Sequence, residues 1–383
     1  MTEALSIAAT FLATILAPSP APRATHIGKL VQPPGFYNSQ MRAITPDYQA
    51  GHGFGPATID VEATRYRTHA LLWRGSGVGV LDLNPPHLVE SEIQAAAGTQ
   101  QLGFGRGPDT GSFHALLWHG TPESVVDLNP PDFFDTYGFG VGGGTQVGWG
   151  IGRSTEGRGH ALLWRGTAES AVDLHPAGYE FSQASATTGT YQLGHATSAS
   201  INYRPRAMLW AGTAETAVEL TPPGFDSSSG KAMDDRSQVG SGSGPATGGI
   251  SHALLWQGTP ESVVDLHPDG FTYSEASSVA GDRQAGVGGT SEGEHHALLW
   301  RGSASTAIDL HRYVEALDPA FTSSFATGVL PSGDVVGFAR GISINGVTFY
   351  AQPVIWRAIP EPSMHVLIAA AVILRLPATR RQR

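Results

Sequence analysis

Short apolar blocks that end in tryptophan recur along the chain, separated by polar stretches rich in glycine. One block reads HALLW at residues 160–164, and alternation would place apolar side chains on both faces of an extended strand. Such a strand must be covered on both sides. The tryptophan returns after 45, 46, 46, 46, 44 and 56 residues, at Trp73, Trp118, Trp164, Trp210, Trp256, Trp300 and Trp356. This period indicates a repeat architecture.

Other residues recur at fixed distances from the tryptophans. An acidic residue follows a tryptophan after nine positions at Asp82, Asp127, Asp173, Glu219, Asp265 and Asp309. A glycine, usually in a Gln-x-Gly pattern, recurs at Gly51, Gly103, Gly148, Gly194, Gly240, Gly286 and Gly337. A serine stands ten residues before the Gln at Ser39, Ser91, Ser182, Ser228 and Ser274. Each unit thus has four short extended segments separated by turn residues, which predicts four-stranded sheets stacked around an axis, a β-propeller.

The two ends of the repeat region complement each other. Residues 30–36 (LVQPPGF) match residues 173–179 (DLHPAGY), so the chain begins with the segment that should follow Trp356. We therefore predict an all-β fold, a seven-bladed β-propeller closed by an N-terminal strand that completes the last blade. The predicted propeller spans residues 26–358. Because closure removes exposed sheet edges, the N-terminal strand should stabilise the ring.

The segment before the repeats has the pattern of a secretory signal. Residues 4–17 form an apolar run, and prolines and small residues follow it. The n-region contains Glu3 and no Lys or Arg, which departs from the usual pattern. We expect residues 1–25 to be a signal peptide and the protein to be exported.

Both the repeat and the C-terminal segment resemble known sequence families. The units are similar to HAF repeats, which occur mostly in extracellular bacterial proteins and imply no general enzymatic activity. Residues 359–383 resemble a PEP-CTERM sorting signal, with Pro360, Glu361 and Pro362, then an apolar run, then Arg380 and Arg381. This resemblance implies an exosortase-type processing enzyme as partner, transient membrane anchoring only, and release to the cell surface or an extracellular matrix.

Composition narrows the chemistry. The chain has 383 residues, a net charge of −10 and no cysteine. Nucleic acid is not an expected partner, because phosphate binding needs a basic patch. Disulfides and thiolate metal sites are excluded by the absence of cysteine. We expect no cofactor and no bound metal.

Repeated polar residues offer a candidate chemistry that we weigh against a structural role. Histidine opens the apolar block in five units, at His69, His114, His160, His252 and His296. Imidazoles gathered near a propeller axis would suit a metal, but residues repeated in nearly every blade usually satisfy backbone groups. We favour the structural role, and expect the repeated acids to bond neighbouring turn amides. We expect Trp149, which lies outside the repeat, to pack within its blade.

Length variation points to a binding surface. Most of it falls between each Gln-x-Gly glycine and the next tryptophan, and function usually lies in loops that vary over a fixed scaffold. These stretches hold unit-specific aromatic and basic residues, which suit sugar faces and acidic polysaccharide. The candidate binding residues, for which we assign no catalytic role, are Arg65, Tyr66, Arg106, Arg153, Tyr203, Arg204 and Arg206.

Two function classes follow from the sequence. We favour a non-enzymatic protein of the cell surface or exopolysaccharide matrix that binds a glycan or protein partner through one ring face. The alternative is a secreted propeller hydrolase or lyase that acts on polysaccharide. An assay of the purified ring against matrix polysaccharide separates the two.

Overall fold

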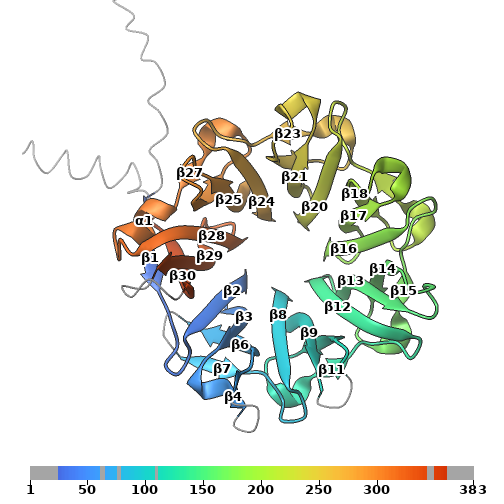
Figure 1. Ribbon diagram of the computed structural model, residues 1–383, viewed down its shortest axis with the longest axis horizontal. Coiled ribbons are helices and arrows are strands. Elements are labelled where there is room, and N and C mark those ends of the chain that lie inside the picture. Colours follow the sequence, from blue (N-terminus) through green and yellow to red (C-terminus); the bar gives the residue numbers. More distant parts are fainter. Residues whose placement is uncertain (1–24, 61–64, 76–78, 108–110, 343–348, 360–383) are drawn as a thin grey trace, which may run out of the picture. The chain divides into compact units, whose positions relative to one another are not determined.

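The protein is a ring of seven four-stranded sheets (Figure 1). The computed structural model describes residues 25–60, 65–75, 79–107, 111–342 and 349–359. The ring comprises His26–Arg357. The signal-peptide prediction lies almost wholly outside the described residues, and the sorting-signal residues Pro360, Glu361, Pro362, Arg380 and Arg381 lie outside them entirely. The prediction of an all-β, seven-bladed propeller is confirmed.

The strands run outward from the axis in each blade. Blade 1 consists of β2 (Asn38–Ile44), β3 (Tyr48–Phe54), β6 (His69–Arg74) and β7 (Val80–Asp82). Blade 2 consists of β8 (Glu90–Ala97), β9 (Gln100–Arg106), β10 (His114–Trp118) and β11 (Val126–Asp127). Blade 3 consists of β12 (Phe133–Gly142), β13 (Thr145–Gly152), β14 (Gly159–Trp164) and β15 (Val172–Asp173). Blade 4 consists of β16 (Phe181–Thr187), β17 (Gln192–Thr197), β18 (Arg206–Trp210) and β19 (Val218–Glu219).

The remaining blades follow the same plan. Blade 5 consists of β20 (Ser227–Met233), β21 (Gln238–Ser243), β22 (His252–Trp256) and β23 (Val264–Asp265). Blade 6 consists of β24 (Tyr273–Ala280), β25 (Arg283–Gly289), β26 (His295–Trp300) and β27 (Ile308–Asp309). Blade 7 consists of β28 (Phe321–Val329), β29 (Val335–Ile342), β30 (Phe349–Ile359) and β1 (Thr25–Leu30). A small hairpin, β4 (Ile59–Asp60) and β5 (Arg65–Tyr66), extends blade 1.

Helical elements in the described residues are short and lie in connections. The 3-10 helices are η1 (Pro56–Thr58), η2 (Pro122–Ser124), η3 (Ala168–Ser170), η4 (Ala199–Ile201), η5 (Ala214–Thr216), η6 (Pro245–Thr247), η7 (Pro260–Ser262) and η8 (Ala304–Thr306). One α-helix, α1 (His311–Glu315), follows β27. No helix within the described ranges is long and apolar enough to cross a membrane.

The N-terminal strand closes the ring as predicted. Strand β1 is the outermost strand of blade 7 and pairs with β30. Just beyond it, the Val31 amide donates to the Pro353 carbonyl at 3.0 Å, and the Val31 side chain is fully buried in a cluster with Trp73 and Ile355. The buried His26 ring donates to the Gly333 carbonyl at 3.1 Å. The first residues of the ring are therefore part of its core.

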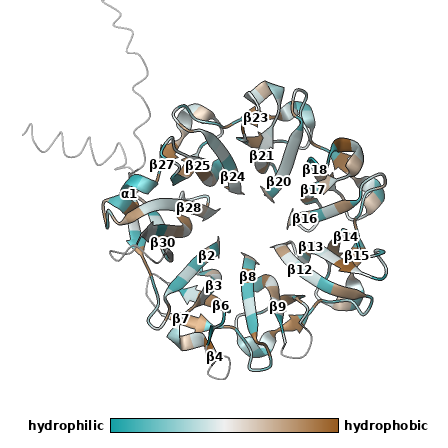
Figure 2. Ribbon diagram, in the orientation of Figure 1, coloured by the Kyte–Doolittle hydropathy of each residue, from teal (hydrophilic) through white to brown (hydrophobic). Residues whose placement is uncertain are grey.

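The hydrophobic core lies between neighbouring blades. All seven repeat tryptophans are at most 1% exposed. Trp118 packs in a cluster with Leu72 and Leu83 of blade 1, and its indole N–H donates to the Leu83 carbonyl at 3.0 Å. Figure 2 shows the same arrangement, because hydrophobic colour gathers away from the axis while inner strands such as β8 and β20 are largely polar or neutral. The repeat tryptophan of each blade thus packs against the preceding blade.

The recurring glycine of Gln-x-Gly faces a bulge in the innermost strand. In blade 2 the pairing of β8 with β9 shifts between Ile93 and Ala95. A Cβ atom on Gly103 would lie 1.8 Å from the Glu92 carbonyl oxygen, which no side chain can accommodate. Bulges bring backbones close and require glycine at such contacts. This explains why the glycine is repeated.

The strand order creates two distinct ring faces. The innermost strand of five blades carries the repeated serine, and the outermost carries the acid in six. We use the name variable face for the face of the ring that is formed by the connections from second to third strands and from one blade to the next. The uniform face carries the hairpins between first and second strands and the short turns that contain η2 and η7. The variable-length connections therefore share a face, as the sequence predicted.

Candidate binding face

The repeated histidines pair with the repeated acids. His160 Nδ1 lies 2.7 Å from Asp173 Oδ2, and four other blades contain the same pair at 2.6 to 2.7 Å. Asp173 Oδ1 accepts the His175 backbone N–H at 2.8 Å, which confirms the predicted bonding of turn amides. The histidine prediction needs correction, because the partner is a carboxylate rather than a backbone group. The hydrogen bond to Asp127 is the main cause that raises the pKa of His114.

The network extends from one blade to the next. The Ser182 hydroxyl, on the innermost strand of blade 4, accepts the Ala161 amide of blade 3 at 2.9 Å. It also bonds His175 Nδ1 at 2.8 Å, while His175 Nε2 donates to the Tyr179 carbonyl at 3.1 Å. Burial and the stacked His160 ring lower the pKa of His175, in keeping with a neutral imidazole. The repeated serine is therefore a cross-blade tether.

These polar pairs do not form a metal site. The histidines lie on the third strand of each blade rather than on the innermost one. In the part of the chain that the structure describes, no group of three or more His, Cys, Asp or Glu is placed to hold a metal ion. Because each histidine is held by its own carboxylate, its repetition follows from the architecture of the blade.

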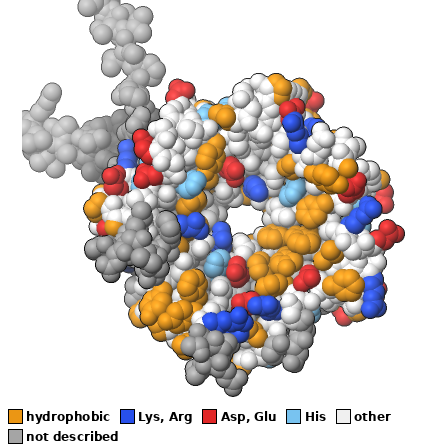
Figure 3. Space-filling model, viewed as in Figure 1, with side chains coloured by type: hydrophobic (Ala, Val, Ile, Leu, Met, Phe, Trp, Pro, Cys, Tyr) orange, Lys and Arg blue, Asp and Glu red, His pale blue; other side chains and the backbone are white. Residues whose placement is uncertain are grey.

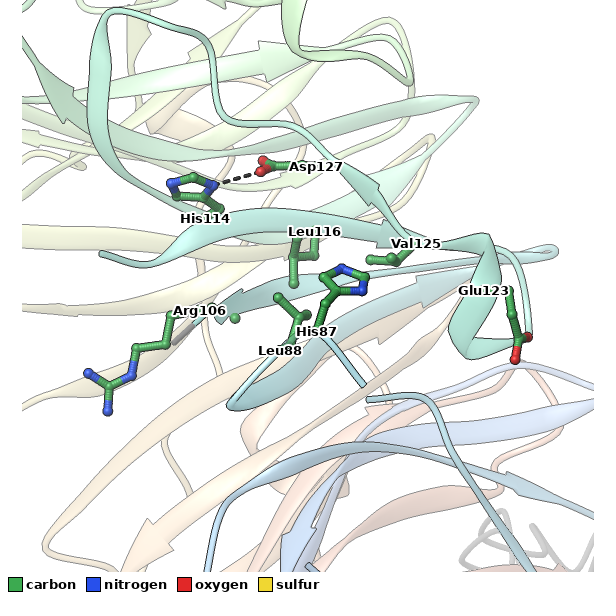
Figure 4. Close-up of a pocket in the computed structure, with 10 residues that line it drawn as sticks. His87, Leu88, Arg106, His114, Leu116, Glu123, Val125 and Asp127 are labelled. Carbon is green, nitrogen blue, oxygen red and sulfur yellow. Dashed lines mark hydrogen bonds and ion pairs between the residues drawn. The ribbon is translucent and has the colours of Figure 1, made fainter. Parts of the chain in front are cut away.

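A pocket of about 370 Å³ lies on blade 2, beside the connection from blade 1 (Figure 4). Leu88, Leu116 and Val125 line it, and His114 enters it with its partner Asp127. Figure 4 shows the Arg106 side chain directed away from these groups. The described lining contains no hydroxyl, thiol or amine side chain. Since the His–Asp pair also occurs in four other blades, it marks no chemistry particular to this pocket.

An aromatic band crosses blades 2 to 4. Tyr137 and Trp149 stack at 4.9 Å between ring centroids, and Phe104 meets Tyr137 edge-on at 5.0 Å. Trp149 contacts Phe181 of blade 4 at 5.7 Å, and Phe113 contacts Tyr137 at 5.7 Å. All five rings are half-buried. Figure 3 shows a hydrophobic patch beside the opening of the central channel. We call Phe104, Phe113, Tyr137, Trp149 and Phe181 the aromatic band.

The structure places the predicted binding residues on variable-face connections or at the strand ends beside them, in blades 1 to 4. Tyr66 on β5 contacts Tyr37 at 5.4 Å, and Arg153 lies 6.0 Å from the Phe134 ring centroid. Tyr203 is 62% exposed in the connection between β17 and β18. Arg65 lies beside Tyr66 on the same short strand.

Three of the predicted arginines are already paired with carboxylates. Arg106 Nε lies 2.6 Å from Glu90, and its guanidinium lies over the Phe113 ring, so it borders the aromatic band. Arg204 pairs with Asp226 at 2.5 Å. Arg206 occupies the position of the repeated histidine and lies 3.5 Å from Glu219. The predicted residues thus share a face, but Arg106 alone among them contacts the band.

Sequence reasoning missed the aromatic band as a unit. Trp149 does pack within its blade, as predicted, through Tyr137. The signal in the sequence was the residue after each Gln-x-Gly glycine, which is Phe104 in blade 2 and Trp149 in blade 3. Pairing across the strands places Phe104 opposite Glu92 and Trp149 opposite Tyr137. Only the stacking of blades shows that these rings meet.

Comparisons with known proteins support the class of protein that the ring defines, a β-propeller. No protein-family model and no curated protein sequence matches the chain. Among solved structures it is similar to the propeller domain of the Trilobed protease from Pyrococcus furiosus, with TM-score 0.57 and 9% identity over 84% of this chain and 95% of that one. A Mycobacterium tuberculosis puromycin-hydrolyzing peptidase gives TM-score 0.55 and 15% identity over 87% of this chain.

The likeness is confined to the fold. The chain spans 55% of the length of the puromycin-hydrolyzing peptidase and 51% of a prolyl endopeptidase that it resembles with TM-score 0.52 and 8% identity. At such identities the propeller architecture is what the proteins share, and their reactions are not transferred to this chain.

Proposed function

We propose that this chain is an exported, non-enzymatic β-propeller of the cell surface or exopolysaccharide matrix that binds a glycan through its variable face. The observation that carries the proposal is the aromatic band. Its rings come from three blades, contact one another and are only half-buried, and Figure 3 shows a hydrophobic patch beside the channel opening. A protein partner is the other class of ligand compatible with an exposed aromatic surface.

The physical basis of glycan binding is stacking on rings that are already ordered. Aromatic side chains offer a large apolar face together with a polar edge. Trp149 is held between Tyr137 and Phe181, so little side-chain entropy remains to be lost when a sugar packs on it. Arg106, fixed by Glu90, supplies hydrogen-bond donors at the border of the band.

The location of the protein is proposed from its terminal segments. Residues 1–25 have the pattern of a signal peptide, and residues 359–383 resemble a PEP-CTERM sorting signal. Together they support export, transient membrane anchoring and processing by an exosortase-type enzyme. A polysaccharide of the extracellular matrix is then the glycan that the exported protein would meet.

A substitution in the band tests the proposal. We expect Trp149→Ala to weaken binding to exopolysaccharide of the native host by tenfold or more, since stacking of aromatic groups and burial of their area contribute about 1.5 kcal/mol or more. Isothermal titration calorimetry measures the loss, and circular dichroism checks that the ring is folded. Tyr191→Ala is the matched control, because Tyr191 is 48% exposed on the uniform face.

Three results would contradict the proposal. Trp149→Ala would bind as the wild type does, or Tyr191→Ala would abolish binding. The third is depolymerisation of the polysaccharide by the purified ring, detected as new reducing ends or unsaturated products, which would identify a hydrolase or lyase.

A further inference from the structure

A second cluster lies on the other side of the channel from the aromatic band, between blades 7 and 1. The Arg340 guanidinium lies 5.0 Å from the Phe338 ring centroid and 5.2 Å from that of Phe325. The Arg42 guanidinium of blade 1 lies 5.8 Å from the same Phe338 ring. Phe325 and Phe338 stack at 4.8 Å. Two cations from neighbouring blades therefore share one aromatic support.

Neither cation forms an ion pair with a carboxylate within the described residues, although Glu92 lies near enough to Arg42 to act on its pKa. Arg106, Arg204 and Arg206 all form ion pairs with carboxylates, whereas Arg42 and Arg340 have no carboxylate within ion-pair distance in the described ranges. Arg42 Nε is buried and has no hydrogen-bond partner there. Burial is the main cause that lowers the pKa of Arg42, and the charge of Arg340 lowers it further while Glu92 opposes the shift. A buried guanidinium N–H without a hydrogen-bond partner is costly unless something binds it.

The channel beside this cluster contains a cavity whose lining includes cations but no carboxylate. This cavity, of about 260 Å³, is lined by residues of all seven innermost strands. That lining contains Arg42 and Lys231 but no Asp or Glu, in a chain of net charge −10. Figure 3 shows both Lys or Arg and Asp or Glu side chains around the opening of the channel. Clefts lined by one sign of charge concentrate ligands of the opposite sign.

The geometry suits a planar anion. Stacking on a ring fixes the plane of a guanidinium and leaves its N–H edge available for two parallel hydrogen bonds to a carboxylate. Arg340 lies near the end of β29 on the variable face and is exposed, while Arg42 lies deeper and lines the channel. An anion entering from this face would meet Arg340 first.

We infer that the glycan bound by this protein is anionic, and that Arg42 and Arg340 bind its carboxylate groups. The inference rests on the proposed function. The aromatic band of blades 2 to 4 stacks on the sugar rings, and the arginine pair of blades 7 and 1 binds uronate carboxylates. The ligand class is thus a polysaccharide that contains uronic acids.

The test compares two glycans with two variants of the full ring. The glycans are exopolysaccharide of the native host and the same material after chemical reduction of its carboxyl groups, with alginate as a defined polyuronate. We expect carboxyl reduction to weaken binding by tenfold or more. We expect Arg340→Gln to weaken binding to the native polymer and to alginate by about tenfold, as for loss of a charge-assisted hydrogen bond, and Arg340→Lys to recover part of it.

The control is Arg165→Gln, which removes the same charge from an exposed residue on the uniform face. It should bind as the wild type does. Arg42→Lys serves as a second variant, provided that its thermal melt shows a folded ring.

The outcomes separate the inference from the proposed function. If Trp149→Ala abolishes binding while carboxyl reduction and Arg340→Gln leave it unchanged, the glycan-binding proposal stands and the anionic inference is overturned. If Arg165→Gln weakens binding as much as Arg340→Gln does, the effect is one of net charge, and the assigned pair is wrong. If the wild type binds neither the host polymer nor alginate, both proposals fail.

Discussion

At the scale of single residues, the ring contains a histidine that is held neutral by its surroundings. His52 is buried on β3, 3.7 Å from Glu92 and near Arg42. Burial, aided by the charge of Arg42, lowers the pKa of His52 from 6.5 to about 3. In the unfolded chain the imidazole gains a proton below its ordinary pKa, whereas in the folded ring it stays neutral until about pH 3.

The sign of the pH dependence follows from this difference. The stability associated with neutral His52 is present above pH 6.5 and is lost as the pH falls toward 3. We expect the free energy of unfolding to decrease by about 2 to 3 kcal/mol between pH 7 and pH 4.5 through this residue, at 1.36 kcal/mol per pH unit. His52→Gln should remove that part of the dependence.

Urea unfolding at the two pH values measures the effect. The exposed His119→Gln is the control and should retain the wild-type dependence. An unchanged pH dependence in His52→Gln would show that His52 is protonated or solvated in the folded ring.

At the scale of elements, β1 is the segment on which closure depends. It covers the outer edge of β30, and the buried Val31 follows it directly. We expect deletion of residues 26–36 to lower the melting temperature sharply, because it exposes that edge and removes buried Val31 and Phe36 from the core. Differential scanning calorimetry measures the change, and an unchanged melt would show that the ring does not depend on β1. Ile27→Ala is the control, since this side chain is 59% exposed.

The sequence predicted the elements better than it predicted the site. Every blade has an apolar block that ends in tryptophan and a glycine at a similar distance before it, so the strand order and the closure by β1 could be predicted from spacing alone. The candidate site depends instead on which side chains of different blades meet, as Phe104 meets Tyr137 and Arg42 meets Phe338. Bulges in the innermost strands also break the alternation, so spacing does not tell which side chains face the channel.

At the scale of the whole molecule, the propeller and the two terminal segments have different proposed fates. The ring spans His26–Arg357. We expect cleavage near Pro360, Glu361 and Pro362 to release it from the membrane, because the resemblance to a sorting signal places the processing site there. Intact mass spectrometry of protein from the native host should find no residues beyond about Pro362. Recovery of the chain through Arg383 would contradict the sorting proposal.

The tether between Ser182 and Ala161 has a consequence for how such a ring can unfold. The polar network of one blade ends on the innermost strand of its successor, and the seam lies between β1 and β30. A repeating segment that starts at the seam is therefore out of phase with the blade. Such a segment contributes the outer edge of one blade and the inner strands of the next. Each internal segment is therefore bonded to both of its neighbours, so no single segment should unfold without opening the sheets on both sides of it.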